Sequence, residues 1–279
     1  MPLCFFVSDL HGSHGRYERL AAAISRERPA AVFLGGDLLP HAMSAPGFLV
    51  EYVIPRFERL RAELGPAYPR VFLIFGNDDP RAEEAAAEEA AGRGLWGYAH
   101  YRRTPWDGLT VVGYAYVPPT PFRLKDWERY DVSHYVEPGC SDPAEGWHTA
   151  PVPEHERRHA TIQDDLEHLT AGVDMGHAIL LIHTPPYHTA LDRAALDGKS
   201  VDHAPLDVHV GSIAVRRFIE TGQPLLTLHG HVHESARLTG SWRERIGRTH
   251  ALSAAHDGPE LALVRFDPND PAGATRELL

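Results

Sequence analysis

Seven residues of the types that bind transition metals stand in five short blocks along the chain, and each block follows an apolar run. They are Asp9, His11, Asp37, Asn77, His183, His231 and His233. Mixed oxygen and imidazole donors suit Mn, Fe or Zn better than Ca or Mg, which prefer nearly all oxygen ligands. A thiolate site is excluded because it needs cysteine. The set is large enough to hold two adjacent ions that share one carboxylate.

Two such ions predict a particular chemistry. Held about 3.5 to 4 Å apart, they generate a hydroxide nucleophile at neutral pH and stabilise the charge that develops on a phosphoryl group. Gly36, Gly76 and Gly230 each precede one of the seven residues, at turns where the backbone approaches closely or takes a positive φ. The residue types and their spacing therefore indicate hydrolysis of a phosphate ester.

The composition agrees with a metalloenzyme and argues against other classes. The 279 residues include 27 Lys and Arg, 38 Asp and Glu, and 19 His, and the formal net charge is -11. This charge disfavours a general nucleic-acid-binding or anionic-membrane surface. Cys4 and Cys140 give no disulfide framework. No secretory h-region or membrane-length apolar run is present, so we expect a cytoplasmic protein without a membrane partner.

Elements that position the blocks can be predicted from the hydrophobic pattern. Apolar runs, interrupted only by Thr227 in the last, predict buried strands at residues 3–7, 30–34, 71–75, 178–182 and 225–228, with further strands at 96–101, 109–116 and near the end of the chain. Helical spacing predicts helices within residues 17–28, 48–64, 80–91, 156–169 and 213–220, and Pro55 should kink or divide the second. In an α/β fold the loops after such strands converge at one edge of the sheet.

Two segments show no periodicity. Residues 117–155 are rich in proline, aromatic and charged residues, and we interpret them as a cap or lid insertion. Residues 187–209 are expected to form a long loop. We therefore predict one catalytic domain, residues 1–279, that carries an inserted cap.

The five blocks together resemble the calcineurin-like metallophosphoesterase family. That family has the pattern D-x-H, then GD, then GNH followed by Asp or Glu, then a lone His, then GHxH. The chain has Asp9-Leu10-His11, Gly36-Asp37, Gly76-Asn77-Asp78-Asp79, His183 and Gly230-His231-Val232-His233, in the same order. It is also similar to bacterial members with His-Val-Gly-Ser before a helix, at 209–212, and His-Gly-His-x-His-Glu-Ser after the next strand, at 229–235.

The resemblance implies a fold and a role for each ligand. The fold would be a four-layer α/β/β/α sandwich with two central mixed sheets. By matched position, Asp9, His11 and His233 would hold one divalent ion, Asn77, His183 and His231 the other, and Asp37 would bridge them. A hydroxide between the ions would attack phosphorus, while imidazoles such as that of His231 neutralise the phosphoryl oxygens.

Asp78 departs from the family pattern, which has histidine at this position, credited with protonating the leaving group or contacting phosphate. An aspartate of pKa about 3.9 is a poor proton donor at neutral pH unless its surroundings raise that value. Adjacent Asp79 is expected to raise the pKa and metals to lower it. A charged Asp78 would repel a dianionic monoester more than a monoanionic diester. We therefore predict a phosphodiesterase, with Asp78, water or another histidine assisting the leaving group.

Residues outside the blocks suggest further roles, each with a structural alternative. Arg123, Lys125 and Trp127 could bind phosphate and a planar base, so a nucleotide-like small-molecule phosphoester is one expected substrate. The alternative is a solvated loop with one buried tryptophan. His14 and His41 follow ligand blocks and could supply the missing acid, or could be solvated loop residues.

Histidines of the long loop also have two interpretations. His188, His203 or His209 could orient a metal ligand through a hydrogen bond, whereas capping and surface placement explain them equally well. For the whole protein, the alternatives are a phosphomonoesterase of the same fold and a non-catalytic metal-binding scaffold. Retention of all seven positions counts against the scaffold. The sequence indicates neither the natural substrate nor the oligomeric state.

Overall fold

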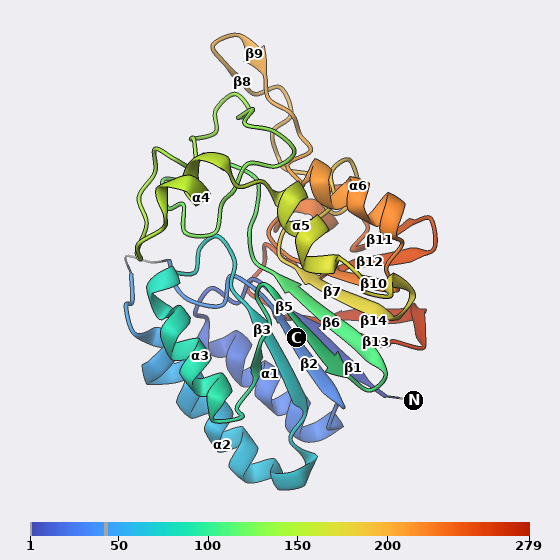
Figure 1. The fold of residues 1–279 in the computed structure, drawn as a ribbon. Helices are drawn as coiled ribbons and strands as arrows, with labels where there is room; N and C mark the ends of the chain where they lie inside the picture. The colour runs from blue at the N-terminus through green and yellow to red at the C-terminus, as the bar shows by residue number, and fades with distance from the viewer. Residues whose placement is uncertain (1, 42–43) are drawn as a thin grey trace.

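The computed structural model describes residues 2–41 and 44–279; Met1, Ala42 and Met43 lie outside the described residues. Two six-stranded mixed sheets stack face to face between two layers of helices (Figure 1). This arrangement confirms the four-layer α/β/β/α sandwich.

The first sheet has the strand order β14-β13-β1-β2-β3-β4. Its strands are β1 (Cys4–Val7), β2 (Ala31–Gly35), β3 (Arg70–Ile74), β4 (Gly97–Tyr98), β13 (Ala262–Asp267) and β14 (Asp270–Leu278). Strands β1 to β4 are parallel, while β13 runs antiparallel to β1 and β14 antiparallel to β13. The carboxyl ends of β1, β2 and β3 therefore lie at one edge.

The second sheet has the strand order β11-β12-β10-β7-β6-β5. Its strands are β5 (Arg102–Trp106), β6 (Leu109–Tyr114), β7 (Ala178–Ile182), β10 (Leu226–His229), β11 (Arg243–Ile246) and β12 (Thr249–Ser253). Strands β6, β7, β10 and β12 are parallel, and the outer strands β5 and β11 are antiparallel to their neighbours. A separate hairpin, β8 (Ser200–Val201) with β9 (Ala204–Pro205), projects from the long loop (Figure 1).

Helices cover the outer face of each sheet. The first sheet is covered by α1 (His14–Glu27), α2 (Ile54–Leu64) and α3 (Glu84–Gly92), and the second by α5 (Ile162–Thr170) and α6 (Ile213–Gly222) (Figure 1). Two short helices, α4 (Glu154–His159) and α7 (Ser235–Thr239), lie outside these layers. Among the described residues, no helix has the length and apolarity to cross a membrane.

Alternation along the strands divides the core in two. In β1, Cys4 and Phe6 face the interior between the sheets, while Phe5 and Val7 belong to the core under the helices. Successive strand residues point to opposite faces, so a strand with apolar residues at every position is buried on both sides. This explains why the strands before the ligand blocks are nearly continuous apolar runs.

Side-chain caps start helices α1, α5 and α6. The Ser13 side chain accepts a hydrogen bond from the Arg16 amide at the start of α1. Pro55 stands in the first turn of α2, directly after a π-helical turn, η1 (Leu49–Val53), so the prediction that it divides the helical stretch is confirmed. Pro at this position removes no needed donor because the first amides of a helix have no partner within it.

Two predicted elements differ from the structure, and one edge strand has no counterpart in the prediction. Residues 156–169 form two helices rather than one, because Thr161 caps α5 and the Ile162 amide donates to the Tyr130 carbonyl. The strand predicted at residues 96–101 is only the short β4. Strand β5, in contrast, was missed, since its sequence Arg-Arg-Thr-Pro-Trp has no apolar run and its pairing with β6 defines it.

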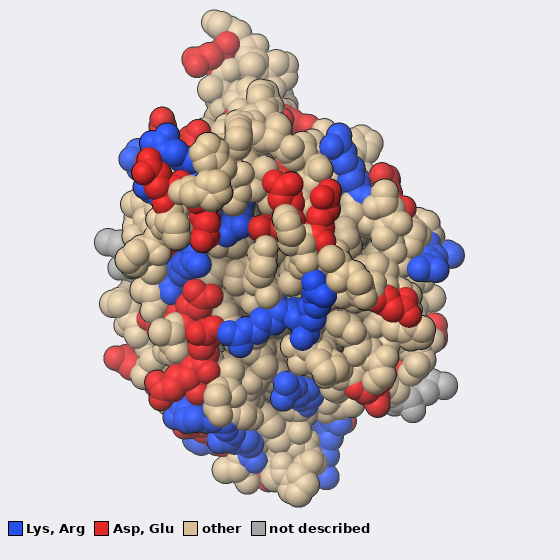
Figure 2. Space-filling model, viewed as in Figure 1, with Lys and Arg blue, Asp and Glu red and all other residues tan. Residues whose placement is uncertain are grey.

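Residues 117–155, the cap segment, are largely irregular and are held by buried polar contacts. The Lys125 ammonium lies 2.5 Å from the Glu128 carboxylate, and both side chains are fully buried. Asp126 accepts hydrogen bonds from the amides of Arg81 and Thr149, each at 2.8 Å. On the face seen in Figure 2, acidic and basic side chains are interspersed rather than gathered into one basic surface.

Candidate metal centre

All seven ligand-type residues lie at strand ends and meet at one edge of the sandwich. Asp9, His11, Asp37 and Asn77 follow β1, β2 and β3 of the first sheet, whereas His183, His231 and His233 follow β7 and β10 of the second. The sequence had suggested convergence at the edge of one sheet. The structure differs in that both sheets contribute, so the site spans the two.

Backbone hydrogen bonds fasten these strand-end loops to one another. The Asp9 amide donates to the Gly36 carbonyl at 2.9 Å and the His11 amide to the Asp37 carbonyl at 2.8 Å. Across the sheets, the His231 amide donates to the Asp9 carboxylate at 3.0 Å. The ligand-type side chains are therefore held by their own main chains before any ligand binds.

One group of side chains comprises Asp9, His11, Asp37 and His233, whose ligand atoms all lie within 4.8 Å of one another. The Nε2 atoms of His11 and His233 are 3.0 Å apart. The His233 Nε2 is 3.2 Å from the Asp9 carboxylate. Two imidazole nitrogens that face each other beside carboxylates have the donor types of a Mn, Fe or Zn site.

A second group comprises Asp37, His183 and His231. The His183 Nε2 lies 3.3 Å from the Asp37 carboxylate, and the His231 Nδ1 lies 2.7 Å from the Asn77 side-chain oxygen. Asn77 thus joins this group through its amide oxygen. Asp37 belongs to both groups, which is the position that a bridging carboxylate requires.

Unpaired nitrogens show that the donor set fits a metal. The Nδ1 atom of His11 and the Nε2 atom of His183 are buried without a hydrogen-bond partner among the described residues. The His183 Nδ1 lies 2.7 Å from the Gly35 carbonyl, which fixes the ring so that Nε2 points at Asp37. An unpaired buried polar atom costs about 1–3 kcal/mol, so a bound cation would supply the missing partner.

Glycine is required where the loops enclose this centre. A Cβ atom on Gly76 would lie 2.6 Å from the His183 Nε2, and one on Gly230 would lie 2.6 Å from the Asp9 carboxylate. Either contact would push a ligand-type side chain out of position. The glycines that precede the ligand blocks are therefore explained by close approach of the backbone.

The charges within the centre are strongly coupled. Burial by itself would raise the pKa of Asp37, but the neighbouring His183 and His11 hold that pKa below its usual range. Burial likewise opposes charge on His183, yet Asp37 raises its pKa to about 10. Burial and the charge of His183 lower the pKa of His231 to about 3, so its ring is neutral. Without metal, protons on His183 and His233 balance the carboxylates, and divalent ions can replace that positive charge.

The two adjacent aspartates after Asn77 have different environments. Asp79 is fully buried and accepts hydrogen bonds from the amides of Leu38, Leu39 and Gly76, at 3.2, 2.7 and 2.9 Å. Asp78 instead faces the centre, 3.6 Å from the His11 Nδ1 and 3.2 Å from the His41 Nδ1.

Burial and the charge of Asp37 raise the pKa of Asp78 to about 6. The sequence interpretation had assigned the raising charge to Asp79. The structure places Asp79 against the loop after β2, where it serves as an anchor, and Asp37 is the carboxylate that acts on Asp78.

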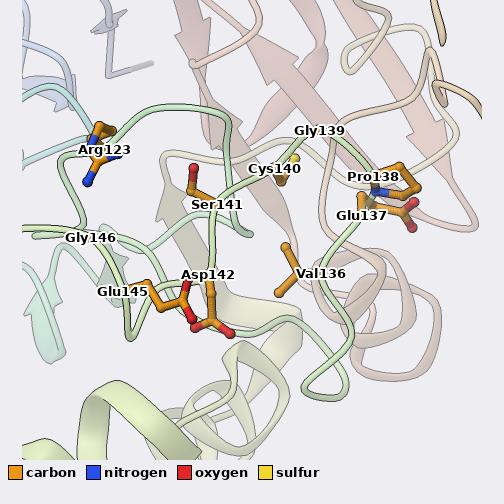
Figure 3. Close-up of a pocket in the computed structure, with 10 residues that line it drawn as sticks. All are labelled: Arg123, Val136, Glu137, Pro138, Gly139, Cys140, Ser141, Asp142, Glu145 and Gly146. Atoms are coloured by element: carbon orange, nitrogen blue, oxygen red, sulfur yellow. The ribbon is translucent and has the colours of Figure 1, made fainter. Parts of the chain in front are cut away.

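Residues of the cap segment do not form the expected substrate contacts. Trp127 is buried and its Nε1 donates to the Asp79 carbonyl at 2.9 Å, and Lys125 is paired with Glu128. Both are structural, so the alternative of a solvated loop with one buried tryptophan is correct for Trp127 and wrong for Lys125, which is buried too. Arg123 lines a separate cavity of about 580 Å³ within the cap segment (Figure 3).

Of the other histidines singled out in the sequence, His41 joins the candidate centre. His14 packs against Tyr52, with ring centroids 4.2 Å apart. The His209 Nδ1 binds Asp192 at 2.8 Å, His188 packs on His209, and His203 is exposed beside the β8–β9 hairpin. None of these three loop histidines orients His183, since the Gly35 carbonyl has that role.

Arg16 is a residue that sequence reasoning missed. Its guanidinium donates to the carbonyl of Asp9 and to that of Gly258, and so ties the first ligand loop to the loop after β12. Nothing in the local sequence distinguishes this arginine from its neighbours, because its partner is 242 positions away.

Comparisons with known proteins agree with this fold. The model of the calcineurin-like phosphoesterase family matches residues 4–235. The crystal structure of TT1561 from Thermus thermophilus has a TM-score of 0.58 at 18% identity, over 99% of this chain and 98% of that one. A dimetal phosphatase from Danio rerio has a TM-score of 0.54 at 14% identity, over 95% and 92%. No curated protein matches the chain.

The two sheets and the histidine and aspartate groups at their shared edge define a metal-dependent hydrolase. With most of its length matched by the family model, the chain belongs to the calcineurin-like phosphoesterases, a family that typically uses a dimetal site.

Proposed function

We propose that the chain is a two-metal phosphodiesterase. The observation that carries the proposal is the position of Asp37, whose carboxylate lies in both groups of potential ligands. Asp9, His11 and His233 are assigned to one ion, Asn77, His183 and His231 to the other, and Asp37 to both. The donor types favour Mn, Fe or Zn.

When bound, a pair of divalent ions supplies a water of lowered pKa as the nucleophile and neutralises charge on the phosphoryl group. The chain's own part is to hold the donors and to receive the ester. The neutral ring of His231 can approach a phosphoryl oxygen, and the fixed strand ends keep the donors in place before the substrate arrives.

The preference for a diester is supported by Asp78. Its side chain is about one-fifth exposed and borders the centre beside His11. A carboxylate there repels a dianionic monoester more strongly than a monoanionic diester. Metal ions would lower the pKa of Asp78 and so keep this charge in place at neutral pH.

His41 is proposed to assist the leaving group. It is three-quarters exposed, and its Nδ1 lies 3.2 Å from the Asp78 carboxylate. This contact can hold the ring while Nε2 remains free to donate to the departing oxygen. The cap segment, which packs on the Asp79 carbonyl through Trp127, is proposed to border the substrate site within one catalytic domain of residues 1–279.

The first test compares bis-nitrophenyl phosphate with nitrophenyl phosphate in the presence of Mn, for the wild type and Asp37→Asn. We expect faster turnover of the diester and a loss of at least about 100-fold in the variant, the scale on which loss of one preorganised charge-stabilising group acts. Full metal content and turnover in Asp37→Asn would refute the bridging role. Faster monoester turnover would favour the phosphomonoesterase, and bound metal without turnover would favour the scaffold.

The role of His41 is tested by varying the leaving group. His41→Ala should slow diesters of poorly leaving alcohols by about 100-fold or more and change nitrophenyl diesters little, since only a poor leaving group needs its proton. His14→Ala is the matched control, because His14 also follows a ligand block but packs against Tyr52. Equal losses on both kinds of ester would exclude His41 as the donor.

A further inference from the structure

A second histidine cluster lies on the surface at α4. His155 and His159 stand four residues apart on this helix, and their ring centroids are 5.2 Å apart. The ring of His134, from the preceding loop, is 5.8 Å from that of His159. All three side chains are exposed, and none contacts the seven candidate ligands of the metal centre among the described residues.

The ring nitrogens of this cluster are free. Within the part of the chain that the structure describes, no nitrogen of His134, His155 or His159 makes a hydrogen bond or an ion pair. Two other exposed histidines differ in this respect. The His168 Nδ1 lies 2.7 Å from the Asp164 carbonyl, and the His177 Nδ1 lies 2.8 Å from the Asp174 carboxylate. The cluster therefore has its donor capacity available.

We infer that His134, His155 and His159 form a surface site for a transition-metal ion of the zinc, nickel or copper type. Two histidines at i and i+4 on a helix present their rings on one face, the spacing by which helices hold zinc. Three imidazoles and one water complete a tetrahedral zinc site, and a set of imidazoles alone disfavours Mg and Ca. This assignment is independent of the phosphoesterase centre.

In the described conformation the three rings do not bring one nitrogen each within 4.8 Å of the others, so the site forms only when the side chains rotate. The rings of His134 and His159 meet edge to face, at an interplanar angle of 66°, rather than converging on one point. Because the side chains are exposed, they can turn without displacing core residues. The nearby positive charge of Arg158 is offset by Glu154, 2.9 Å away, whereas Arg157 in the same turn has no ion-pair partner among the described residues, so the positive charge of the helix is offset only in part.

Such an ion would join two segments that already meet near one end. Arg129 pairs with Glu156 of α4 at 2.9 Å and with Asp165 of α5 at 2.7 Å, and the carbonyls of Tyr130 and Asp131 accept the amides of Ile162 and Gln163. A shared ion would add a contact at His134, 21 residues in sequence from His155. Metal binding should therefore stabilise this part of the cap segment.

Zinc stoichiometry tests the site. The full chain is dialysed against buffered micromolar zinc, and zinc per chain is measured by mass spectrometry for three proteins: wild type, His155→Gln/His159→Gln and the matched control His168→Gln/His177→Gln. We expect the wild type and the control to bind one equivalent more than the cluster variant. Equal zinc content in all three would overturn the inference, whatever the catalytic activity.

A single substitution tests whether the third histidine takes part. His134→Gln should weaken zinc binding at the cluster by at least about tenfold, measured by titration against a chelator of known affinity, because one of three protein ligands is lost. Thermal unfolding in EDTA should be the same for all variants, which checks that the exposed substitutions leave the fold intact. Unchanged zinc affinity in His134→Gln would reject the three-histidine site.

Discussion

The metal centre and the cap segment both bury charged side chains, but they satisfy them differently. In the cap segment, Lys125 donates to Glu128 and to the Thr120 carbonyl, and Thr120 in turn donates to Glu128 through its amide and hydroxyl. In the centre, the His11 Nδ1 and the His183 Nε2 make no hydrogen bond among the described residues, although the latter lies 3.3 Å from the Asp37 carboxylate.

This difference distinguishes buried polar groups that stabilise the fold from buried polar groups that are available to bind a ligand. A closed network is complete in the folded chain and contributes to its specificity. Buried donors without hydrogen-bond partners lower the stability of the fold until a ligand binds, which is typical of functional sites. Burial and charge alone do not distinguish the Lys125–Glu128 network from the ligand groups, whereas the hydrogen bonds of their buried atoms do. The comparison holds for these two sets of side chains, since His148, elsewhere in the cap segment, also has buried ring nitrogens without hydrogen-bond partners among the described residues.

The largest expected effect on the free energy of unfolding comes from removing Lys125 from its network with Glu128 and Thr120. Lys125→Met leaves Glu128 buried without its cation, and breaking such a pair costs about 3–5 kcal/mol of the free energy of unfolding. Urea unfolding in EDTA measures this loss. His11→Gln, measured in the same way, should change stability far less, because the His11 Nδ1 has no hydrogen-bond partner among the described residues and burial lowers the pKa of the ring, so no charged pair is broken. Similar losses in both variants would invalidate the comparison.

Metal binding should supply the missing partners of the ligand-type side chains and so stabilise the fold. At a metal concentration 100 to 1,000 times the dissociation constant, the free energy of unfolding should rise by about 2.7–4.1 kcal/mol. Calorimetry with Mn and with EDTA measures the difference. In Asp37→Asn most of this gain should disappear, since both groups of ligands lose the shared carboxylate. A gain of full size in that variant would place the ion elsewhere.

The adjacent aspartates provide a comparison within two residues. Asp79→Asn should cost about 1–3 kcal/mol, because three backbone amides lose part of their acceptor. Asp78→Asn should leave the free energy of unfolding within about 0.5 kcal/mol and change turnover instead. Unfolding curves and kinetics of the two variants test this, and a reversed pattern would mean that their roles are exchanged.

The smallest expected effect is the contribution of His100 to the pH dependence of stability. His100 is buried, accepts the Ala115 amide at 3.0 Å, and has a pKa well below its usual value because of burial and nearby arginines. The unfolded chain therefore binds a proton first as the pH falls below about 6.5, and stability drops by up to about 1.4 kcal/mol per pH unit. His100→Gln in EDTA should lack this part of the slope. Identical slopes would mean that His100 is not neutral in the fold.

The sequence predicted the elements whose information is local. Each strand before a ligand block is a nearly continuous apolar run, and the turn after it carries the polar residues, so both could be located without a structure. The division of the helical stretch at Pro55 was predictable for the same reason. The resemblance to a family added the four layers and the pairing of two sheets.

What the sequence missed depends on distant partners. Strand β5 forms against β6, and α4 and α5 are separated where Tyr130 holds the Ile162 amide. The role of Asp79 follows from its hydrogen bonds to the loop after β2, and the role of Trp127 follows from its hydrogen bond to the Asp79 carbonyl. Residue type alone assigned Lys125 and Trp127 to substrate binding, since charged and aromatic side chains in a loop resemble a recognition surface until their partners are known.

Four of the seven ligand-type residues have a left-handed backbone: Asp9 at φ 56°, His11 at 45°, Asp37 at 50° and His231 at 76°. Glycine adopts these angles without a steric penalty, whereas Asp and His, although more tolerant than most residues, adopt them at some cost. Selection on folding alone would thus favour glycine at each position, in opposition to selection on chemistry. In a descendant lineage released from catalysis, these four positions should drift to glycine or asparagine first, and such replacements would mark the loss of activity before the fold itself changed.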